Sequence, residues 1–487
     1  MNRSMIHTTL LALACAAAMS GCASMAPAYQ RPDAPVRASF SSTPSVAVAD
    51  EPVPVARLEW RSVFIDPQLQ QVIALALDNN RDLRVAMLNI EAARAKYRIQ
   101  RADLLPSVDA TASHTAARSN TTATGSQVSR SATAQVGFSS WELDLFGRIR
   151  SLKDEALQTW LATEQTQRST RMSLVAEVAG DWLTVGAYQQ RLKLAEQTLA
   201  SQRESLALTE RRHAQGLLSG VDLASLQASV ESARADVAAY TTSLAQARNA
   251  LELVVGTAVS DDQLPAATTG TTDAVALAPL PAEVSSAVLL QRPDVLYAEH
   301  TLKAANADIG AARAAFFPTI SLTASTGSGS DALSSLFDSG TKQWSFAPTI
   351  SLPIFHAGAL KASLDQAKIS KDVSVAQYEK AIQSAFSEVA DALATRATVD
   401  EQRDAQQARV AATTRARELA EARYRNGIDS RLELLDAQRT DDAAQQDLVT
   451  LRLAEATNRV TLYKVLGGGA DALAGGGGTW ATEDQPL

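Results

Sequence analysis

Two acidic side chains stand three residues apart near the C-terminal end of the chain. Glu433 and Asp436 fall in a segment of good helix formers, so a helix would place both carboxylates on one face. Two carboxylates on one face concentrate negative charge, which attracts cations and makes each charge repel the other. The alternative is a solvated helix face, the usual position of Glu and Asp.

The acidic pair follows one of two glycine-containing turns, at Gly216 and Gly427, which join long helical segments. Residues 148–215 and 359–426 contain no proline, and at 1.5 Å per residue each would be about 100 Å long. Heptad-like apolar spacing predicts coiled-coil packing for these segments. The segments that run back from the turns are residues 222–255 and 431–466.

The first 21 residues predict an export signal. A basic start at Arg3 precedes an apolar core at residues 10–19 and then small residues. A membrane helix needs about 20 apolar residues, so this core is too short to span a bilayer.

Cys22 follows this signal directly. Met19-Ser20-Gly21-Cys22 resembles the cleavage box of bacterial lipoproteins, which implies cleavage before Cys22 and acyl chains attached to its thiol. Several acyl chains anchor a protein stably where one would not. Ala23, rather than Asp, follows the cysteine, and by the lipoprotein sorting rule this implies the outer membrane. The alternative is an ordinary signal peptide with an incidental cysteine.

The sequence repeats its landmarks once, at an interval of 211 or 212 residues, which predicts two structural halves that arose by duplication. The paired landmarks are Asp82 and Asp294, Pro106 and Pro318, Gly147 and Gly358, Gly216 and Gly427, and Gly256 and Gly467.

Each half also contains a stretch in which apolar and polar residues alternate, at residues 107–143 and 319–352. Period-2 alternation predicts hairpins with one apolar and one polar face, as in transmembrane barrels. Two exposed hairpins of an ordinary sheet are the alternative. Two hairpins supply four strands, whereas known single-chain barrels have at least about eight, so three chains would have to pool theirs.

The composition argues against several other classes of protein. A net charge of −8 disfavours a nucleic-acid partner, and five His and two Cys leave little for a metal site or a disulfide framework. The chain has no nucleophile elbow, metal-ligand spacing or phosphate loop. We therefore expect no enzyme, no metal and no cofactor other than lipid on Cys22.

These signals predict six segments, each with its own role. They are a signal peptide at 1–21, an acylated tether at 22–57, a first repeat at 58–256 with its helical tip near 213–222, a linker at 257–280, a second repeat at 281–467 with its tip near 424–433, and a Gly-rich disordered tail at 468–487.

Four motifs in combination resemble the outer-membrane efflux lipoproteins, the NodT/OprM-like branch of the TolC family. The resemblance runs from about residue 22 to residue 469. The motifs are the opening at 60–106, Trp141-Glu142-Leu143-Asp144-Leu145-Phe146-Gly147-Arg148, Gln291-Arg292-Pro293-Asp294-Val295, and Leu462-Tyr463-Lys464-Val465-Leu466-Gly467-Gly468-Gly469.

The resemblance implies a mainly α fold with a small β part, in two tandem repeats. It implies a homotrimer in the outer membrane of a Gram-negative bacterium, with a 12-strand transmembrane β-barrel continued by a periplasmic α-helical barrel. It further implies a passive channel for drugs or other small toxic compounds, served by a periplasmic adapter and an inner-membrane RND pump. A protein-secretion channel of the same fold and a lipid-anchored coiled-coil scaffold are the rival functions.

The family's functional positions fall at the predicted tips. By their offset from Gly427, Glu433 and Asp436 match acidic residues that form the periplasmic entrance, and Asp222 matches an acidic tip position of the first half. Asp429 is a further candidate for the entrance.

The resemblance also implies a gate. Tyr424 matches a tip tyrosine that helps to hold the entrance shut, but the place of its arginine partner, two residues after the glycine, holds Asp429 here. Arg431 is the candidate substitute.

Overall fold

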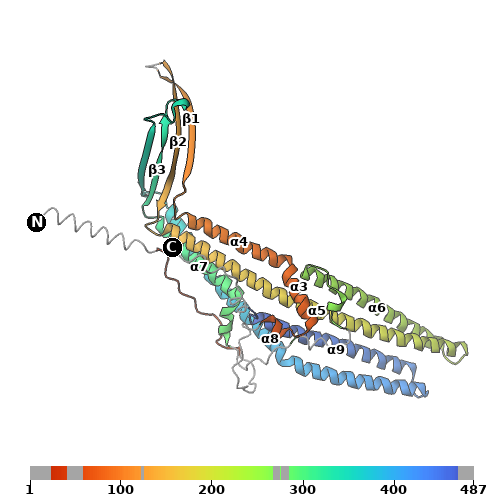
Figure 1. The fold of residues 1–487 in the computed structure, drawn as a ribbon. Helices are drawn as coiled ribbons and strands as arrows, with labels where there is room; N and C mark the ends of the chain where they lie inside the picture. Colours follow the sequence, from red (N-terminus) through yellow and green to blue (C-terminus); the bar gives the residue numbers. More distant parts are fainter. Residues whose placement is uncertain (1–23, 41–58, 122–124, 267–274, 276–284, 470–487) are drawn as a thin grey trace. The chain divides into compact units, whose positions relative to one another are not determined.

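The computed structural model describes residues 24–40, 59–121, 125–266, 275 and 285–469 (Figure 1). The predicted signal peptide, Cys22 and the tail from residue 470 lie outside these residues. So do residues 41–57 of the predicted tether and much of the predicted linker.

The described chain forms two compact units, and each contains parts of both sequence halves. The first unit takes in described residues of Met1–Asp33, Leu88–Glu164 and Tyr297–Lys380. The second takes in described residues of Ala34–Met87, Gln165–Leu296 and Ala381–Leu487.

The first unit contains an antiparallel sheet in the order β1-β2-β3-β4 (Figure 1). Its strands are β1 (Asp109–Thr121), β2 (Gly125–Leu143), β3 (Thr319–Ser330) and β4 (Lys342–Ser351). Within the described chain, β1 pairs only with β2 and β4 only with β3, so each outer strand leaves one edge unpaired.

A β-bulge in β2 keeps the apolar side chains of the sheet on one face. Before the bulge, Phe138 lies opposite Ala324, and after it Trp141 lies opposite Leu322. The apolar positions of β2 thus change from even to odd numbers across the irregularity, because an extra residue shifts the alternation by one. Ser140 adopts a φ of 53° there, and its N–H donates to Thr323 Oγ1 over 3.0 Å.

The helices repeat at the same interval as the landmarks. The short helices are α4 (Arg81–Ala102) and α7 (Pro293–Ala314), the long ones α5 (Arg148–Ala214) and α8 (Ala359–Arg425), and the returning ones α6 (Gly220–Val255) and α9 (Arg431–Val465). The smaller elements are α2 (Trp60–Val63), α3 (Pro67–Asn79), and the 3₁₀ turns η2 (Asp261–Gln263), η4 (Ser286–Gln291) and η5 (Leu333–Ser335).

Three pairs of glycines explain much of the repeat. Gly216 and Gly427 end α5 and α8 with a φ of 73° each, a left-handed conformation that costs a side-chain-bearing residue about 1–2 kcal/mol. The other two pairs have positive φ as well: Gly147 and Gly358, and Gly256 and Gly467. The same backbone turns therefore recur in both halves and require the same residue type.

The apolar heptad positions of the long helices form the interior of the second unit. On α5, Val178, Trp182 and Val185 are buried, and Leu199 packs with Val230 and Ala233 of α6. On α8, Ile382 and Val389 are buried. This spacing places α6 alongside α5, and α9 lies alongside α8 (Figure 1).

In the first unit, the segment at residues 24–31 packs against α7. Glu299 of α7 accepts hydrogen bonds from Tyr29 and from Arg31, whose Nη2 lies 2.7 Å from Oε2, and Lys303 Nζ lies 3.0 Å from Oε1. Burial raises the pKa of Glu299, but Lys303 and Arg31 outweigh it and bring the pKa below its usual value. The stability that this contact contributes is therefore fully present at pH values above the ordinary pKa of a glutamate. It is lost as the pH falls through the lowered pKa of Glu299.

Candidate functional site

The first tip is the turn between α5 and α6. Ser219 caps α6, since its Oγ accepts from the N–H of Asp222 over 3.2 Å and donates to Asp222 Oδ2 over 2.6 Å. His213 Nδ1 lies 2.9 Å from the carbonyl oxygen of Leu218. The predicted entrance residue Asp222 is thus part of the helix cap, where its charge also favours the positive end of the helix.

The second tip, between α8 and α9, also has a serine as its helix cap. Ser430 Oγ accepts from the N–H of Glu433 over 3.3 Å, and Glu433 Oε2 accepts from the N–H of Ser430 over 3.0 Å. This reciprocal pair is a capping box. The carboxylate of Glu433 is therefore held in place locally while the side chain remains exposed.

Asp429 makes an ion pair that the sequence analysis did not anticipate. Its two carboxylate oxygens each lie 2.6 Å from a guanidinium nitrogen of Arg423 on α8. This bond to Arg423 lowers the pKa of Asp429 below its ordinary value. The pair closes the turn, which explains why an acid fits at this position.

Arg431 lies over the ring of Tyr424 in the same chain, with its Cζ 5.3 Å from the ring centroid. Burial lowers the pKa of Arg431, although Tyr424 and the charge of Asp222 act in the opposite direction. Its Nε and Nη2 are buried without a hydrogen-bond partner in the described chain. The structure therefore brings the two predicted gate residues together and brings Asp222 of the first tip near them.

Asp436 is an exposed acid near the second tip. Its carboxylate lies 3.3 Å from Arg439, but the two side chains are 66% and 86% exposed. An exposed pair of this kind contributes little stability, so Asp436 keeps most of its charge available to solvent. Both Glu433 and Asp436 belong to the first turns of α9.

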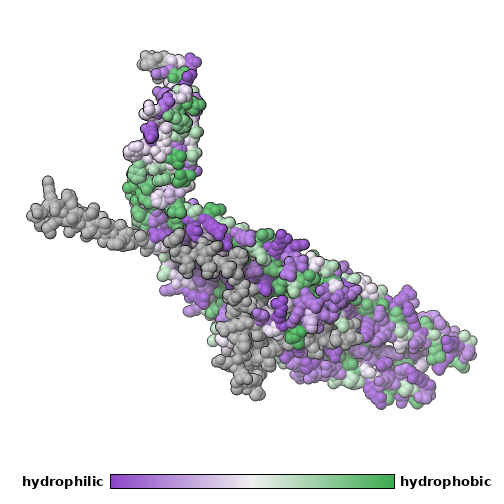
Figure 2. Space-filling view, in the orientation of Figure 1, coloured by the Kyte–Doolittle hydropathy of each residue, from purple (hydrophilic) through white to green (hydrophobic). Residues whose placement is uncertain are grey.

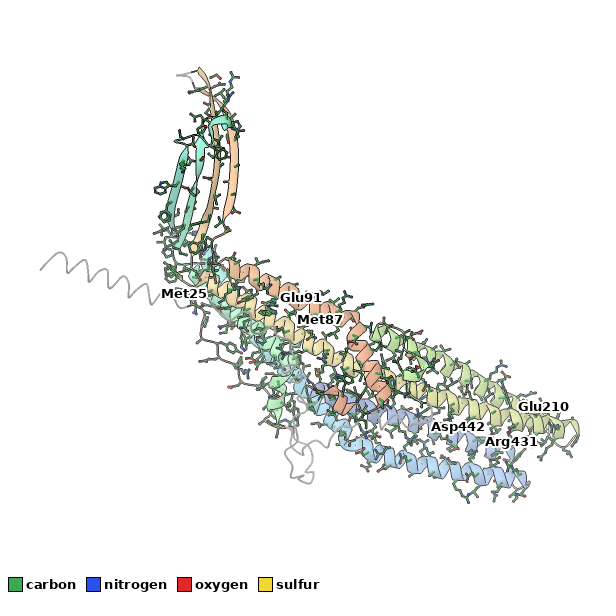
Figure 3. All side chains as sticks on the ribbon, in the orientation of Figure 1. Met25, Met87, Glu91, Glu210, Arg431 and Asp442 are labelled. Carbon is green, nitrogen blue, oxygen red and sulfur yellow. The ribbon has the colours of Figure 1, made fainter. Side chains whose placement is uncertain are left out.

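A polar groove runs between α5, α6 and α9 in the second unit, with a volume of about 660 Å³. Its walls include hydroxyl and acidic side chains: Thr198, Ser225, Ser229, Ser232, Asp236 and Asp442. Burial raises the pKa of Asp442, although a hydrogen bond from Thr198 acts in the opposite direction. Figure 3 shows Arg431 at the start of α9 and Asp442 further along it.

The groove also contains two amide oxygens that lack a hydrogen-bond partner among the described residues, Gln202 Oε1 and Gln446 Oε1. Sequence reasoning missed this groove. The serines at 225, 229 and 232 recur at helical spacing and were the available signal.

The sheet has an apolar face with large exposed side chains. Trp344 is 79% exposed and Phe346 59%, and across the strands Ile320 lies opposite Ile350. Hydrophobic residues are prominent on the side of the sheet that Figure 2 shows. The opposite face carries hydroxyls that bond across strands, with Ser113 Oγ and Thr133 Oγ1 2.8 Å apart and Ser325 Oγ and Ser345 Oγ 2.8 Å apart.

None of the helices in the described part of the chain has both the length and the apolar composition that a membrane span requires.

Comparison with known proteins places these features in a family. The family model described as outer membrane efflux protein matches residues 72–257 and 284–468, one match in each half. The toluene efflux pump outer membrane protein TtgC of Pseudomonas putida is 49% identical over 465 residues, 95% of this chain and 96% of the relative. The cation efflux system protein CusC of Escherichia coli is 42% identical over 464 residues, 94% of this chain and 99% of the relative.

Solved structures show the same fold. A crystal structure of CusC aligns with a TM-score of 0.83 and 40% identity, covering 92% of this chain and 100% of that chain. The open state of the MtrE outer membrane channel of Neisseria gonorrhoeae aligns with a TM-score of 0.83 and 39% identity, covering 92% and 99%. The chain thus belongs to the outer membrane efflux protein family and has its TolC-like fold, mainly α with a small sheet and two tandem repeats.

Proposed function

We propose that this protein is the outer-membrane channel of a tripartite efflux system, which passively conducts drugs or other small toxic compounds to the exterior. It acts as a homotrimer and makes or breaks no covalent bond. A periplasmic adapter and an inner-membrane RND pump deliver the substrate.

The sheet is the observation that carries this proposal. Its two outer strands leave edges that no described strand pairs with, and its apolar face leaves large side chains exposed. Lipid tolerates neither an unpaired backbone edge nor a polar outward face. Three copies that join β1 of one to β4 of the next would close the edges into a 12-strand barrel with hydroxyls toward the lumen.

Conductance of the purified protein in a planar bilayer tests this assignment. We expect discrete conductance steps from material that runs as a trimer after cross-linking in detergent. Monomeric material without conductance would contradict the proposal and would favour the coiled-coil scaffold.

Support for lipid attachment at Cys22 comes from the residues that follow it. Ser24 Oγ lies 3.0 Å from Ser151 Oγ on α5, and Arg313 on α7 donates to the carbonyl oxygen of Met25 over 3.0 Å. These contacts fix the chain just after Cys22 to the unit that contains the sheet. Acyl chains on Cys22 would then enter the same outer membrane as the strands.

For the adapter, we propose the groove between α5, α6 and α9 as a docking surface for one of its helices. The side-chain oxygens of Gln202 and Gln446, which have no partner among the described residues, would accept hydrogen bonds from amide, lysine or arginine side chains. The acids Asp236 and Asp442 would do the same. A groove between packed helices suits a further helix, since ridges of side chains fit such grooves.

Filling the groove should block the adapter. We expect Ser229→Trp to lower co-purification of the cognate adapter at least tenfold, because the indole occupies the space of the incoming helix. Ala228→Trp places the same side chain on an exposed position of α6 next to the groove and should leave co-purification unchanged. Equal loss in both variants, or in neither, would contradict this docking surface.

A further inference from the structure

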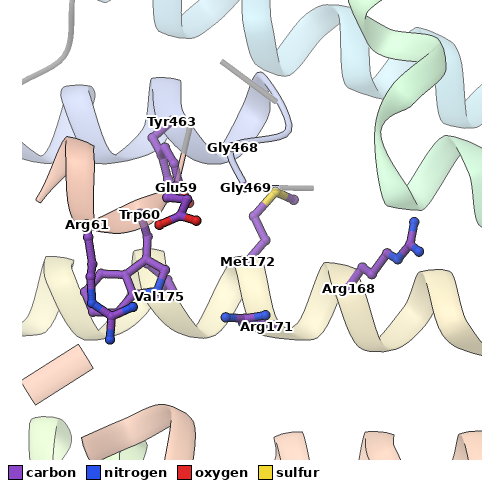
Figure 4. Close-up of a pocket in the computed structure, with 10 residues that line it drawn as sticks. All are labelled: Glu59, Trp60, Arg61, Arg168, Arg171, Met172, Val175, Tyr463, Gly468 and Gly469. Atoms are coloured by element: carbon purple, nitrogen blue, oxygen red, sulfur yellow. The ribbon is translucent and has the colours of Figure 1, made fainter. Parts of the chain in front are cut away.

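We propose that the second unit contains a binding site for a small oxyanion, a phosphate or carboxylate group, between α2, α5 and the end of α9. The site is a cavity of about 110 Å³, shown in Figure 4. A cavity of this size has room for one such group. Its polar and aromatic lining comprises Glu59, Trp60, Arg61, Arg168, Arg171 and Tyr463.

The helix α5 presents two arginines to this cavity. Arg168 and Arg171 are three residues apart, so they lie on one face of the helix together with Met172 and Val175 of the lining. A third guanidinium comes from α2, where Arg61 lies over the ring of Trp60 with its Cζ 4.3 Å from the ring centroid. Trp60 is buried, which fixes the ring over which the exposed Arg61 lies.

Neither arginine of α5 makes a side-chain ion pair or hydrogen bond in the described part of the chain. Burial lowers the pKa of Arg171, and the nearby positive charge of Arg61 lowers it further. Tyr463 and Glu59 act in the opposite direction and raise it. An oxyanion would relieve this cost by accepting paired N–H bonds from the planar guanidinium. Among the described residues that line the cavity, Glu59 is the one carboxylate, so three cations outnumber it.

The end of α9 gives the cavity a rigid wall. Tyr463 is 2% exposed and packs edge-on against Phe64, with ring centroids 5.3 Å apart. A side chain at Gly468 would collide with the ring of Tyr463, so glycine is required where the chain passes it. Burial raises the pKa of Tyr463, which keeps its hydroxyl protonated and able to donate to an anion.

Binding of inorganic phosphate to the purified full-length protein tests the site. At constant ionic strength, we expect phosphate, but not chloride, to raise the melting temperature and to bind in isothermal titration. Arg171→Gln should weaken phosphate binding at least tenfold and remove the phosphate-dependent rise. Arg171→Lys should also bind more weakly than the native protein, because it keeps the charge but loses the planar fork.

Two further variants separate the site from a general charge effect. Arg203→Gln removes an exposed cation elsewhere on α5 and should leave phosphate binding unchanged. Glu59→Gln should tighten binding severalfold, since it removes the like charge from the lining. Absence of a phosphate-specific effect in the native protein, native affinity in Arg171→Gln, or an equal loss in Arg203→Gln would overturn the proposal.

The oxyanion has two possible sources, free phosphate or carboxylates of this chain. Neutralising the C-terminal acids in a Glu483→Gln/Asp484→Asn variant distinguishes them. Higher phosphate affinity in this variant would show that the chain's own carboxylates compete for the site, and unchanged affinity would show that the free ion is the ligand. Neither outcome depends on conductance, so this test stands apart from the channel assignment.

Discussion

Phe346→Arg should prevent assembly of the channel in the outer membrane. Phe346 lies on the apolar face of β4, opposite Ala324 of β3, and is 59% exposed in one chain. An arginine on the lipid face of a barrel costs about 2–4 kcal/mol at the bilayer midplane and about 0–1 near the interface. Each trimer would carry three copies, so we expect the loss of most membrane-inserted trimer and of conductance per milligram of protein.

The neighbouring residue supplies the control for this experiment. Ser345 lies on the opposite face, where its hydroxyl is 2.8 Å from that of Ser325. Ser345→Arg should therefore insert normally and place three cations in the lumen, lowering the preference for cations. Gel migration of the trimer and bilayer conductance measure both variants. Normal insertion of Phe346→Arg together with failure of Ser345→Arg would mean that the faces are inverted.

Much of the fold could be predicted because its signals are local. The long helices α5 and α8 end within one residue of the predicted segments, since a glycine with positive φ follows each of them at Gly216 and Gly427. The short helices α4 and α7 end at Ala102 and Ala314, in each case four residues before a proline, Pro106 or Pro318. Before each proline, hydrogen bonds of a turn replace those of the helix, such as the bond from the Leu105 N–H to the carbonyl oxygen of Ala102.

The features that sequence reasoning missed depend on contacts between distant residues or on irregular backbone. The bulge at Phe138 and Trp141 adds one residue to β2, and simple alternation cannot reveal such an insertion. The groove and the arginine cavity each combine residues from several helices. No local pattern shows which faces of these helices meet.

At the tips, the sequence identified the acids but not their local partners. The bond between Arg423 and Asp429 spans six residues around a turn, whose geometry depends on Gly427. The capping box at Ser430 and Glu433 was readable from the pattern of Ser followed three residues later by Glu, yet the same Glu was assigned to an entrance. A cap and a pore role are compatible, because capping leaves the charge of Glu433 in place.

Removing both charges tests the entrance assignment, and the structure dictates the substitutions. Glu433→Gln preserves the capping box, since Gln serves at this position as well as Glu. Asp436→Asn removes the second charge from an exposed site. We expect the double variant to lose most of the channel's cation preference in 0.1 M KCl. The single change at Asp436 should have the larger effect, because the carboxylate of Glu433 already accepts a backbone hydrogen bond.

The dependence on salt and a matched variant make this expectation specific. In 1 M KCl the Debye length falls to about 3 Å, so the double variant and the native protein should become alike. Glu231→Gln removes a similar acid on α6, which pairs with Arg234 three residues away just as Asp436 pairs with Arg439. It should leave the reversal potential unchanged. Native selectivity in the double variant at low salt would assign Glu433 and Asp436 to the cap and to a solvated helix face.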